Sequence, residues 1–225
     1  PNRKEEENRF LRNVEKTVER GGTVLVPSFA MGRSQDILMI LEDSDLDLEI
    51  HYDGMGKTIT KTMLEHKNEL LNPSKLETVF GKVRKVSSKS DRKKALNADV
   101  IVSTSGMLDG GPAIWYLNRL RQDNRNSVYL TGYQAEGTGG RMLLEKSRLP
   151  IYGNITPINL EVKRYDFSTH AGHKELVNFA KKCEAKDVIL YHCDNKTSKP
   201  KLKESLLELG ITVHDSNNRK TYYIK

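Results

Sequence analysis

The 225-residue sequence has few cysteines and no long apolar run. Only Cys183 and Cys193 occur, which excludes a disulfide framework and indicates a reducing compartment. No stretch reaches the length of a membrane-spanning helix, and the polar opening residues do not form a signal peptide. We therefore expect a chain of the cytoplasm, or of the nucleus in a eukaryote, without a membrane partner.

An initiator methionine and an internal repeat are also missing, since the chain opens at Pro1 with a charged segment. We expect an expressed piece, a processed product or a fragment of a longer protein. Positive charge is in excess, with 37 Lys and Arg against 30 Asp and Glu, a net charge of +7. A basic excess favours polyanionic partners, because each neutralised phosphate releases counterions. It also keeps many ordinary proteins dispersed, so charge alone leaves both explanations open.

Short apolar runs alternate with amphipathic stretches through the first 131 residues. This rhythm is typical of an α/β fold, with a mainly parallel sheet flanked by helices. The strands are expected at 23–26, 48–52, 100–103 and 127–131, and the helices at 8–20, 34–41, 58–71 and 112–121. Gly21-Gly22 and Asn72-Pro73 are read as helix ends. The basic segment 83–94 is expected to be a mobile loop.

The pattern changes after residue 150. Residues 151–165 resemble a β-ribbon without helices, helices are expected at 174–182 and 200–209, and strands at 188–191, 211–214 and 221–224. A boundary near 160–167 predicts two domains, residues 1–165 and 166–225.

Three glycine-containing loops follow predicted parallel strands, at 27–33, 103–111 and 131–140. Ligands bind at the carboxyl ends of such strands, where glycine lets the backbone approach and a helix N-terminus favours an anion. One such loop can be a simple turn, but three at one sheet edge favour a binding site. Arg33 suits either a bidentate phosphate contact or a surface ion pair. Asp53–Thr58 resembles a nucleotide P-loop, but His51 stands where the motif needs glycine, so we reject it.

Two histidines end strand-like segments, His170 in Asp166-Phe-Ser-Thr-His and His192 directly after 188–191. Histidine serves both as a metal ligand and as a proton carrier near neutral pH. The pair favours the rim of a metal-dependent active site over surface or capping histidines. The sequence gives weaker support for a metal-binding or catalytic role to the other four histidines, His51, His66, His173 and His214.

Seven segments in a fixed order carry a resemblance to a known family: Gly21-Gly22, Val26-Pro-Ser-Phe-Ala-Met-Gly-Arg33, Ser105-Gly-Met107, Gly132-Tyr133, Glu136-Gly-Thr138, Phe167-Ser-Thr-His170 and Tyr191-His192. The set resembles the β-CASP branch of the metallo-β-lactamase fold, which includes the nuclease subunit of the cleavage and polyadenylation machinery and its archaeal relatives. The resemblance implies a β-CASP domain at 1–165. It also implies that 166–225 are the C-terminal segment of a metallo-β-lactamase domain.

In function, the resemblance implies part of a zinc-dependent nuclease that processes single-stranded RNA. His192 matches a zinc ligand of the family, and His170 matches a residue that acts as proton donor to the leaving oxygen. The expected substrate-binding residues are Arg33, Ser105, Gly106, Met107, Gly137 and Thr138.

The departures from the family concern the metal site. The His-x-His-x-Asp-His motif, a further histidine, the bridging aspartate and an acidic motif precede this region in the family and are absent here. We expect two zinc ions in the complete enzyme, with the other ligands on an upstream lactamase half, in cis or as a separate chain. The chain alone is then expected to be inactive. A homodimer and an RNA-processing complex are further options for partners.

Two other functions compete with the nuclease. A non-catalytic RNA-binding or scaffolding relative has no chemical need for either His170 or His192, so their presence favours the enzyme. A nucleotide-binding α/β enzyme depends on the glycine loops alone.

Overall fold

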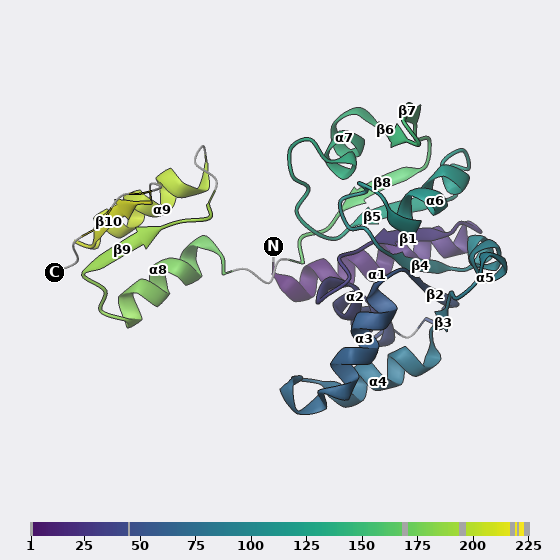
Figure 1. Cartoon of the computed structure of the whole chain (residues 1–225), viewed down its shortest axis with the longest axis horizontal. Helices are drawn as coiled ribbons and strands as arrows, with labels where there is room; N and C mark the ends of the chain where they lie inside the picture. Colours follow the sequence, from purple (N-terminus) through teal and green to yellow (C-terminus); the bar gives the residue numbers. More distant parts are fainter. Residues whose placement is uncertain are drawn as a thin grey trace. The chain divides into compact units, whose positions relative to one another are not determined.

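A computed structural model describes residues 2–44, 46–167, 171–193, 197–216, 219 and 221–222. It divides into two compact units, Pro1–Phe167 and Ser168–Lys225 (Figure 1).

The first unit is built on a six-stranded sheet in which all neighbouring strands are parallel, in the order β3-β2-β4-β1-β5-β8. Val24 at the start of β1 lies opposite Val100 of β4 and Ser127 of β5. The predicted α/β class with a mainly parallel sheet is confirmed. The strands are β1 Val24–Pro27, β2 Ile50–Asp53, β3 Arg84–Lys85, β4 Val100–Ser103, β5 Ser127–Leu130 and β8 Glu161–Arg164.

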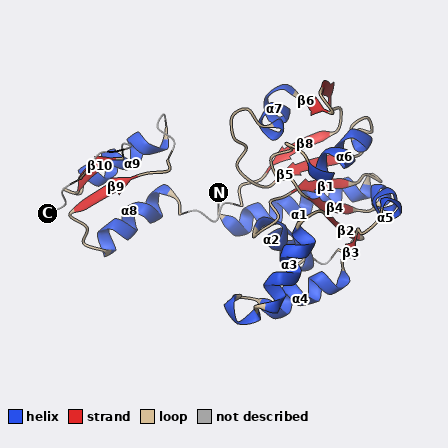
Figure 2. Cartoon of the chain, in the orientation of Figure 1, coloured by secondary structure: helices blue, strands red, loops and turns tan. Residues whose placement is uncertain are grey.

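Helices cover both faces of this sheet (Figure 2), because successive strand side chains point to opposite sides. Leu25 and Ile101 belong to a core shared with α6, whereas Val24 and Val100 belong to a second core shared with α1, α2 and α4. The helices are α1 Arg3–Glu19, α2 Arg33–Glu42, α3 Gly56–Glu65, α4 Pro73–Lys82, α5 Lys89–Lys94, α6 Gly111–Leu120 and α7 Gly139–Lys146, with short 3₁₀ turns η1 Lys67–Glu69 and η2 Ala95–Asn97. The antiparallel hairpin β6 Arg148–Ile151 and β7 Asn154–Pro157 follows α7. The ribbon predicted at 151–165 is right only in part, because residues 161–164 form β8 of the parallel sheet.

A cluster of buried aromatic rings ends the first unit. The ring of Phe10 in α1 meets Tyr129, Tyr165 and Phe167 edge to face, at centroid distances of 5.9, 5.2 and 5.5 Å. All four side chains are fully buried, so the chain belongs to the core of this unit as far as Phe167.

Two predictions for the first unit are wrong. Pro73 begins α4 instead of ending a helix, because the first turn of a helix does not use the N–H that proline lacks. The predicted loop at 83–94 contains β3 and α5. Ser88 caps this helix: its hydroxyl accepts from the Asp91 N–H at 3.0 Å, and the Asp91 carboxylate accepts from the Ser88 N–H at 3.0 Å.

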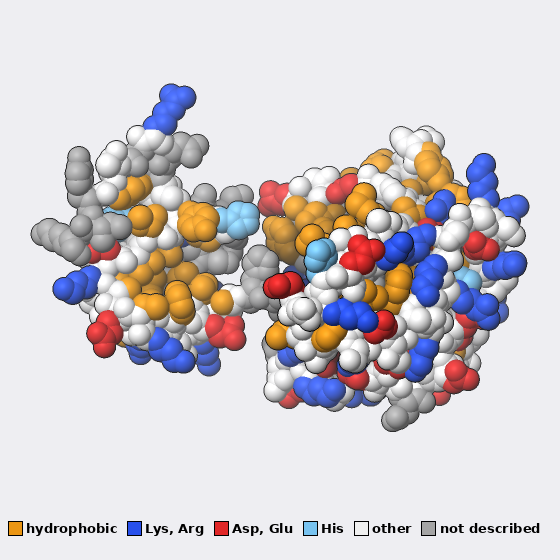
Figure 3. Space-filling model, turned by 60° about the horizontal axis from the view of Figure 1, so that its bottom comes forward, with side chains coloured by type: hydrophobic (Ala, Val, Ile, Leu, Met, Phe, Trp, Pro, Cys, Tyr) orange, Lys and Arg blue, Asp and Glu red, His pale blue; other side chains and the backbone are white. Residues whose placement is uncertain are grey.

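The second unit contains a parallel strand–helix–strand element. β9 Asp187–Leu190 pairs with β10 Thr212–Asp215, α9 Ser198–Leu207 connects them, and α8 His173–Lys182 precedes them. Large apolar side chains remain on its surface (Figure 3), among them Phe179, 67% exposed, and Tyr191, 77% exposed. Of the predicted strand 221–224, Thr221 and Tyr222 are not in a strand, and the rest lies outside the described residues.

Among the helices that the structure describes, none combines the length and the apolar character needed to cross a bilayer.

Candidate functional site

The three glycine loops lie at one edge of the sheet. Strands β4, β1 and β5 are adjacent and parallel, so the loops 104–110, 28–32 and 131–138 all leave the sheet at its carboxyl edge (Figure 1). This is where open α/β sheets bind their ligands.

Direct hydrogen bonds join these loops to one another. The Ser28 N–H donates to the Ser103 carbonyl at 2.8 Å, and the Gly140 N–H donates to the Met107 carbonyl at 2.7 Å. The side-chain amide of Gln134 donates to the Gly106 carbonyl at 3.1 Å. The loops therefore form one connected surface. Gln134 was not singled out in the sequence, although an amide side chain within a glycine loop is a signal for such a contact.

Gly106 is the point of closest approach between two loops. A Cβ atom there would lie 2.9 Å from the Phe29 nitrogen and 3.1 Å from the Ser28 carbonyl carbon. Both are backbone atoms, which cannot rotate away. Gly106 itself is buried, whereas Ser105 and Met107 on either side are partly exposed to solvent.

Gly106→Ala is expected to lower the free energy of unfolding by about 1–3 kcal/mol, because the extra methyl group forces the two loops apart. Gly81→Ala is the matched control, since a Cβ at Gly81 in α4 meets nothing within 4 Å. Alanine there is expected to be neutral or to stabilise by up to about 1 kcal/mol. Denaturant unfolding of both variants measures the difference. Equal stability of the two would contradict the close loop contact.

The β5 loop ends at Thr138, which caps α7. Its hydroxyl donates to the Ala135 carbonyl at 2.7 Å and accepts from the Arg141 N–H at 3.3 Å. Gly137 and Thr138 line a groove of about 390 Å³ together with Asp109 and Tyr152. The Asp109 carboxylate accepts from the Gly139 N–H at 2.8 Å and joins the β4 loop to this helix start.

Arg33 is the first residue of α2 and makes an ion pair with Asp36, Nη1 to Oδ2 at 2.5 Å. Its side chain is only 11% exposed. Burial lowers the pKa of the Arg33 guanidinium, although Asp36 acts in the opposite direction. Arg33 therefore makes the ion pair that the sequence left open as one of its two roles, and the pair is partly buried instead of lying on the surface.

His192 follows β9 by two residues, and it is exposed, with a left-handed backbone φ of 54°. His170 lies outside the described residues. Among the residues that are described, no group of three His, Cys, Asp or Glu side chains is arranged to hold a metal ion. A zinc site needs three or four such donors, and the described residues do not bring that many together.

Most of the remaining histidines have hydrogen-bond partners of their own. His51 bonds Glu49 at 2.9 Å, His173 at the start of α8 bonds Ser205 at 3.0 Å, and His214 bonds Asp187 at 2.7 Å. His66 is the C-cap of α3. Each therefore has a hydrogen bond or a capping position within the fold, which fits the weaker sequence support for a metal-binding or catalytic role.

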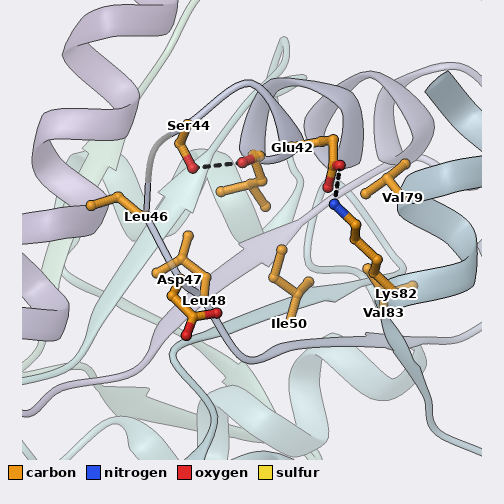
Figure 4. Close-up of a pocket in the computed structure, with 10 residues that line it drawn as sticks. Glu42, Ser44, Leu46, Asp47, Leu48, Ile50, Val79, Lys82 and Val83 are labelled. Atoms are coloured by element: carbon orange, nitrogen blue, oxygen red, sulfur yellow. Dashed lines mark hydrogen bonds and ion pairs between the residues drawn. The ribbon is translucent and has the colours of Figure 1, made fainter.

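A second hollow of about 160 Å³ lies where β2 begins, away from the glycine loops (Figure 4). Its described lining is mainly leucine, isoleucine and valine, and an ion pair between Glu42 and Lys82 lies beside it. It lacks the glycine backbone and helix starts of the carboxyl edge.

The loops and topology define the class: an α/β protein whose glycine loops share the carboxyl edge of a parallel sheet. Residues 34–143 match the family model described as the Beta-Casp domain. Residues 155–214 match the Zn-dependent metallo-hydrolase RNA specificity domain. The chain belongs to the β-CASP family of metallo-β-lactamase-fold proteins, as the sequence indicated.

Similar proteins are found in archaea. RNase aCSPSF2 of Saccharolobus solfataricus is 38% identical over 222 residues, which cover 97% of this chain and 44% of that protein. The protein named Probable RNase MJ4, of Methanocaldococcus jannaschii, is 39% identical over 197 residues, or 85% of this chain and 46% of that protein. Transcription termination factor FttA of the same organism is 32% identical over 247 residues, which cover 99% of this chain and 38% of that protein. The chain thus spans less than half the length of these relatives.

Proposed function

We propose that this chain is part of a zinc-dependent nuclease that hydrolyses phosphodiester bonds in single-stranded RNA. The observation that carries the proposal is the meeting of three hydrogen-bonded glycine loops at the carboxyl edge of the sheet. The family models support it, since one is a zinc-dependent metallo-hydrolase RNA specificity domain. Two of the relatives carry the name RNase.

The loops would bind the phosphate backbone of RNA. Backbone N–H groups and hydroxyls of such loops are the groups that bind phosphate oxygens, and the absence of a side chain at Gly106 lets two of the loops meet closely. The proposed contacts are Ser105, Gly106, Met107, Gly137 and Thr138, with positive charge from Arg33. A net charge of +7 adds to the attraction.

Cleavage would depend on both histidines. We assign His192 as a zinc ligand and His170 as the group that donates a proton to the leaving oxygen. Bound zinc supplies a water activated for attack and neutralises charge on the phosphate. The complete site would hold two zinc ions, with its other ligands on an upstream lactamase half, in cis or as a separate chain.

Residues 1–165 would then form the β-CASP domain, and residues 166–225 would complete the lactamase domain. The exposed Phe179 and Tyr191 support this, because large apolar surfaces commonly mark contact with further structure. The alternative is a non-catalytic RNA-binding or scaffolding relative. The observation on its side is that no group of three His, Cys, Asp or Glu side chains among the described residues is arranged to hold a metal ion.

RNA binding by the loops is expected to weaken steeply with added salt, because phosphate contacts dominate such affinity. Arg33→Ala should weaken binding and reduce the slope of log K against log salt by about 1. Arg125→Ala is the control, since Arg125 is an exposed arginine just before β5, at the opposite edge of the sheet. Filter binding of a single-stranded RNA across a salt series measures both. Binding that ignores salt, or equal effects of the two variants, would count against the loops as the RNA surface.

A further inference from the structure

The polar face of α1 holds the backbone that leads out of the first unit. Arg9 donates to the Arg164 carbonyl at 2.7 Å, Glu6 accepts from the Asp166 N–H at 2.8 Å, and Arg3 donates to the Phe167 carbonyl at 3.0 Å. The three side chains are spaced three residues apart, on one side of the helix. We call these three residues the α1 ladder.

The spacing of the three ladder residues along α1 matches the spacing of their partners along the extended chain. Six residues of α-helix, from Arg3 to Arg9, rise about 9 Å, and three residues of extended chain, from Arg164 to Phe167, span about 10 Å. The order is reversed, with Arg9 on residue 164 and Arg3 on residue 167, so the backbone runs antiparallel to α1. The ladder can therefore form only when residues 164–167 are extended and in this register.

The ladder is charged and partly removed from water. The Glu6 side chain is 7% exposed and receives two hydrogen bonds from Arg9, at 2.6 and 2.8 Å. The Arg9 hydrogen bonds lower the pKa of Glu6, so the carboxylate is ionised at neutral pH. Arg9 also lies over the Tyr165 ring at 4.2 Å, and Arg3 lies over the Phe167 ring at 4.8 Å. Asp36 of α2 fixes Arg3 by an ion pair at 2.6 Å.

The ladder is not needed to attach α1 to the sheet, because Phe10 and Val14 are fully buried and already do so. What it adds is a fixed, extended backbone at residues 164–167, the last described residues before His170 in the sequence. We propose that Arg3, Glu6 and Arg9 are positioning residues that set the path of the chain toward His170. The role in catalysis rests on the proposed nuclease function.

The first test is local and needs no activity. In Glu6→Ala, amide hydrogen exchange at Asp166 and Phe167 is expected to rise about tenfold or more, because Asp166 loses a charged acceptor. Exchange at Leu25 in β1 should stay unchanged. Glu5→Ala is the control, an exposed carboxylate on the same helix. Arg9→Met repeats the test from the side of Arg9, the partner of Glu6, and methionine keeps the apolar part of the arginine side chain. The exposed Arg12→Met is its control.

The second test uses the zinc-loaded protein that contains this chain. Glu6→Ala is expected to lower kcat for RNA cleavage at least tenfold, with KM and zinc content unchanged, because Glu6 bonds Arg9 and the Asp166 N–H, neither of which is assigned to RNA or zinc. A rise in exchange equal to that of Glu5→Ala, or one that is uniform and includes Leu25, would overturn the proposal. A local rise with an unchanged kcat would overturn it too. Absence of RNA cleavage by the unmodified protein would instead refute the proposed function, and the exchange test would still decide the placement.

Discussion

Replacement of either histidine by alanine is expected to abolish RNA cleavage by the complete zinc-loaded nuclease, for different reasons. His192→Ala should lose zinc, because the variant lacks a metal ligand. His170→Ala should keep its zinc and lose about 10²–10⁴-fold in rate, which is the usual contribution of a proton donor. His66→Ala, at the exposed end of α3, is the control and should retain both zinc and activity. Metal analysis and single-turnover cleavage measure the two properties separately.

A substrate with a good leaving group separates the two roles further. A nitrophenolate leaves without being protonated, so an activated phosphodiester should partly rescue His170→Ala and leave His192→Ala inactive. Equal zinc loss in both variants, with rescue in neither, would make His170 a metal ligand and refute its role as proton donor.

Asp53→Ala is expected to lower the free energy of unfolding by about 3 kcal/mol. Asp53 is buried at the carboxyl end of β2, where its carboxylate accepts from Arg92 at 2.7 Å, from the Tyr116 hydroxyl at 3.0 Å and from the Gly54 N–H at 2.6 Å. Tyr116 is fully buried, and both burial and the nearby carboxylate raise the pKa of its hydroxyl. Alanine would leave that hydroxyl without its partner.

Asp123→Ala is the matched control, because Asp123 pairs with Arg125 on the surface. Its loss should cost far less than the loss of Asp53, because exposed ion pairs contribute little. Urea or thermal unfolding of both variants gives the comparison. A difference of less than about 1 kcal/mol between them would show that the Asp53 network does not stabilise this edge of the sheet.

The sheet was predictable because its strands are short, buried apolar runs. The runs at 23–26 and 100–103 became β1 and β4, whose alternate residues enter two cores. Their parallel direction then placed the glycine loops at one edge, as expected from the sequence. The helix end predicted at Asn72-Pro73 was wrong because proline can both end a helix and begin one. The charge of residues 83–94 obscured the capping signal of Ser88 and Asp91.

Contacts between distant residues could not be read from the sequence. Spacing left Arg33 open between phosphate and an ion pair, and only the fold brings Asp36 into contact with both Arg33 and Arg3. The α1 ladder joins residues more than 150 positions apart, so no local pattern announces it. The roles of His170 and His192, and of the loop residues as RNA contacts, stay predictions.

The central claim is that this chain contributes to RNA cleavage by a zinc enzyme. Its most direct test is the cleavage of a single-stranded RNA by the protein that contains this chain, before zinc removal by a chelator, after it, and after zinc is restored. We predict that cleavage is lost with zinc and returns with it, while RNA binding by the glycine loops persists throughout. Cleavage that survives complete zinc removal would contradict the account. RNA binding without cleavage by the fully zinc-loaded protein would also contradict it, and would identify a non-catalytic relative.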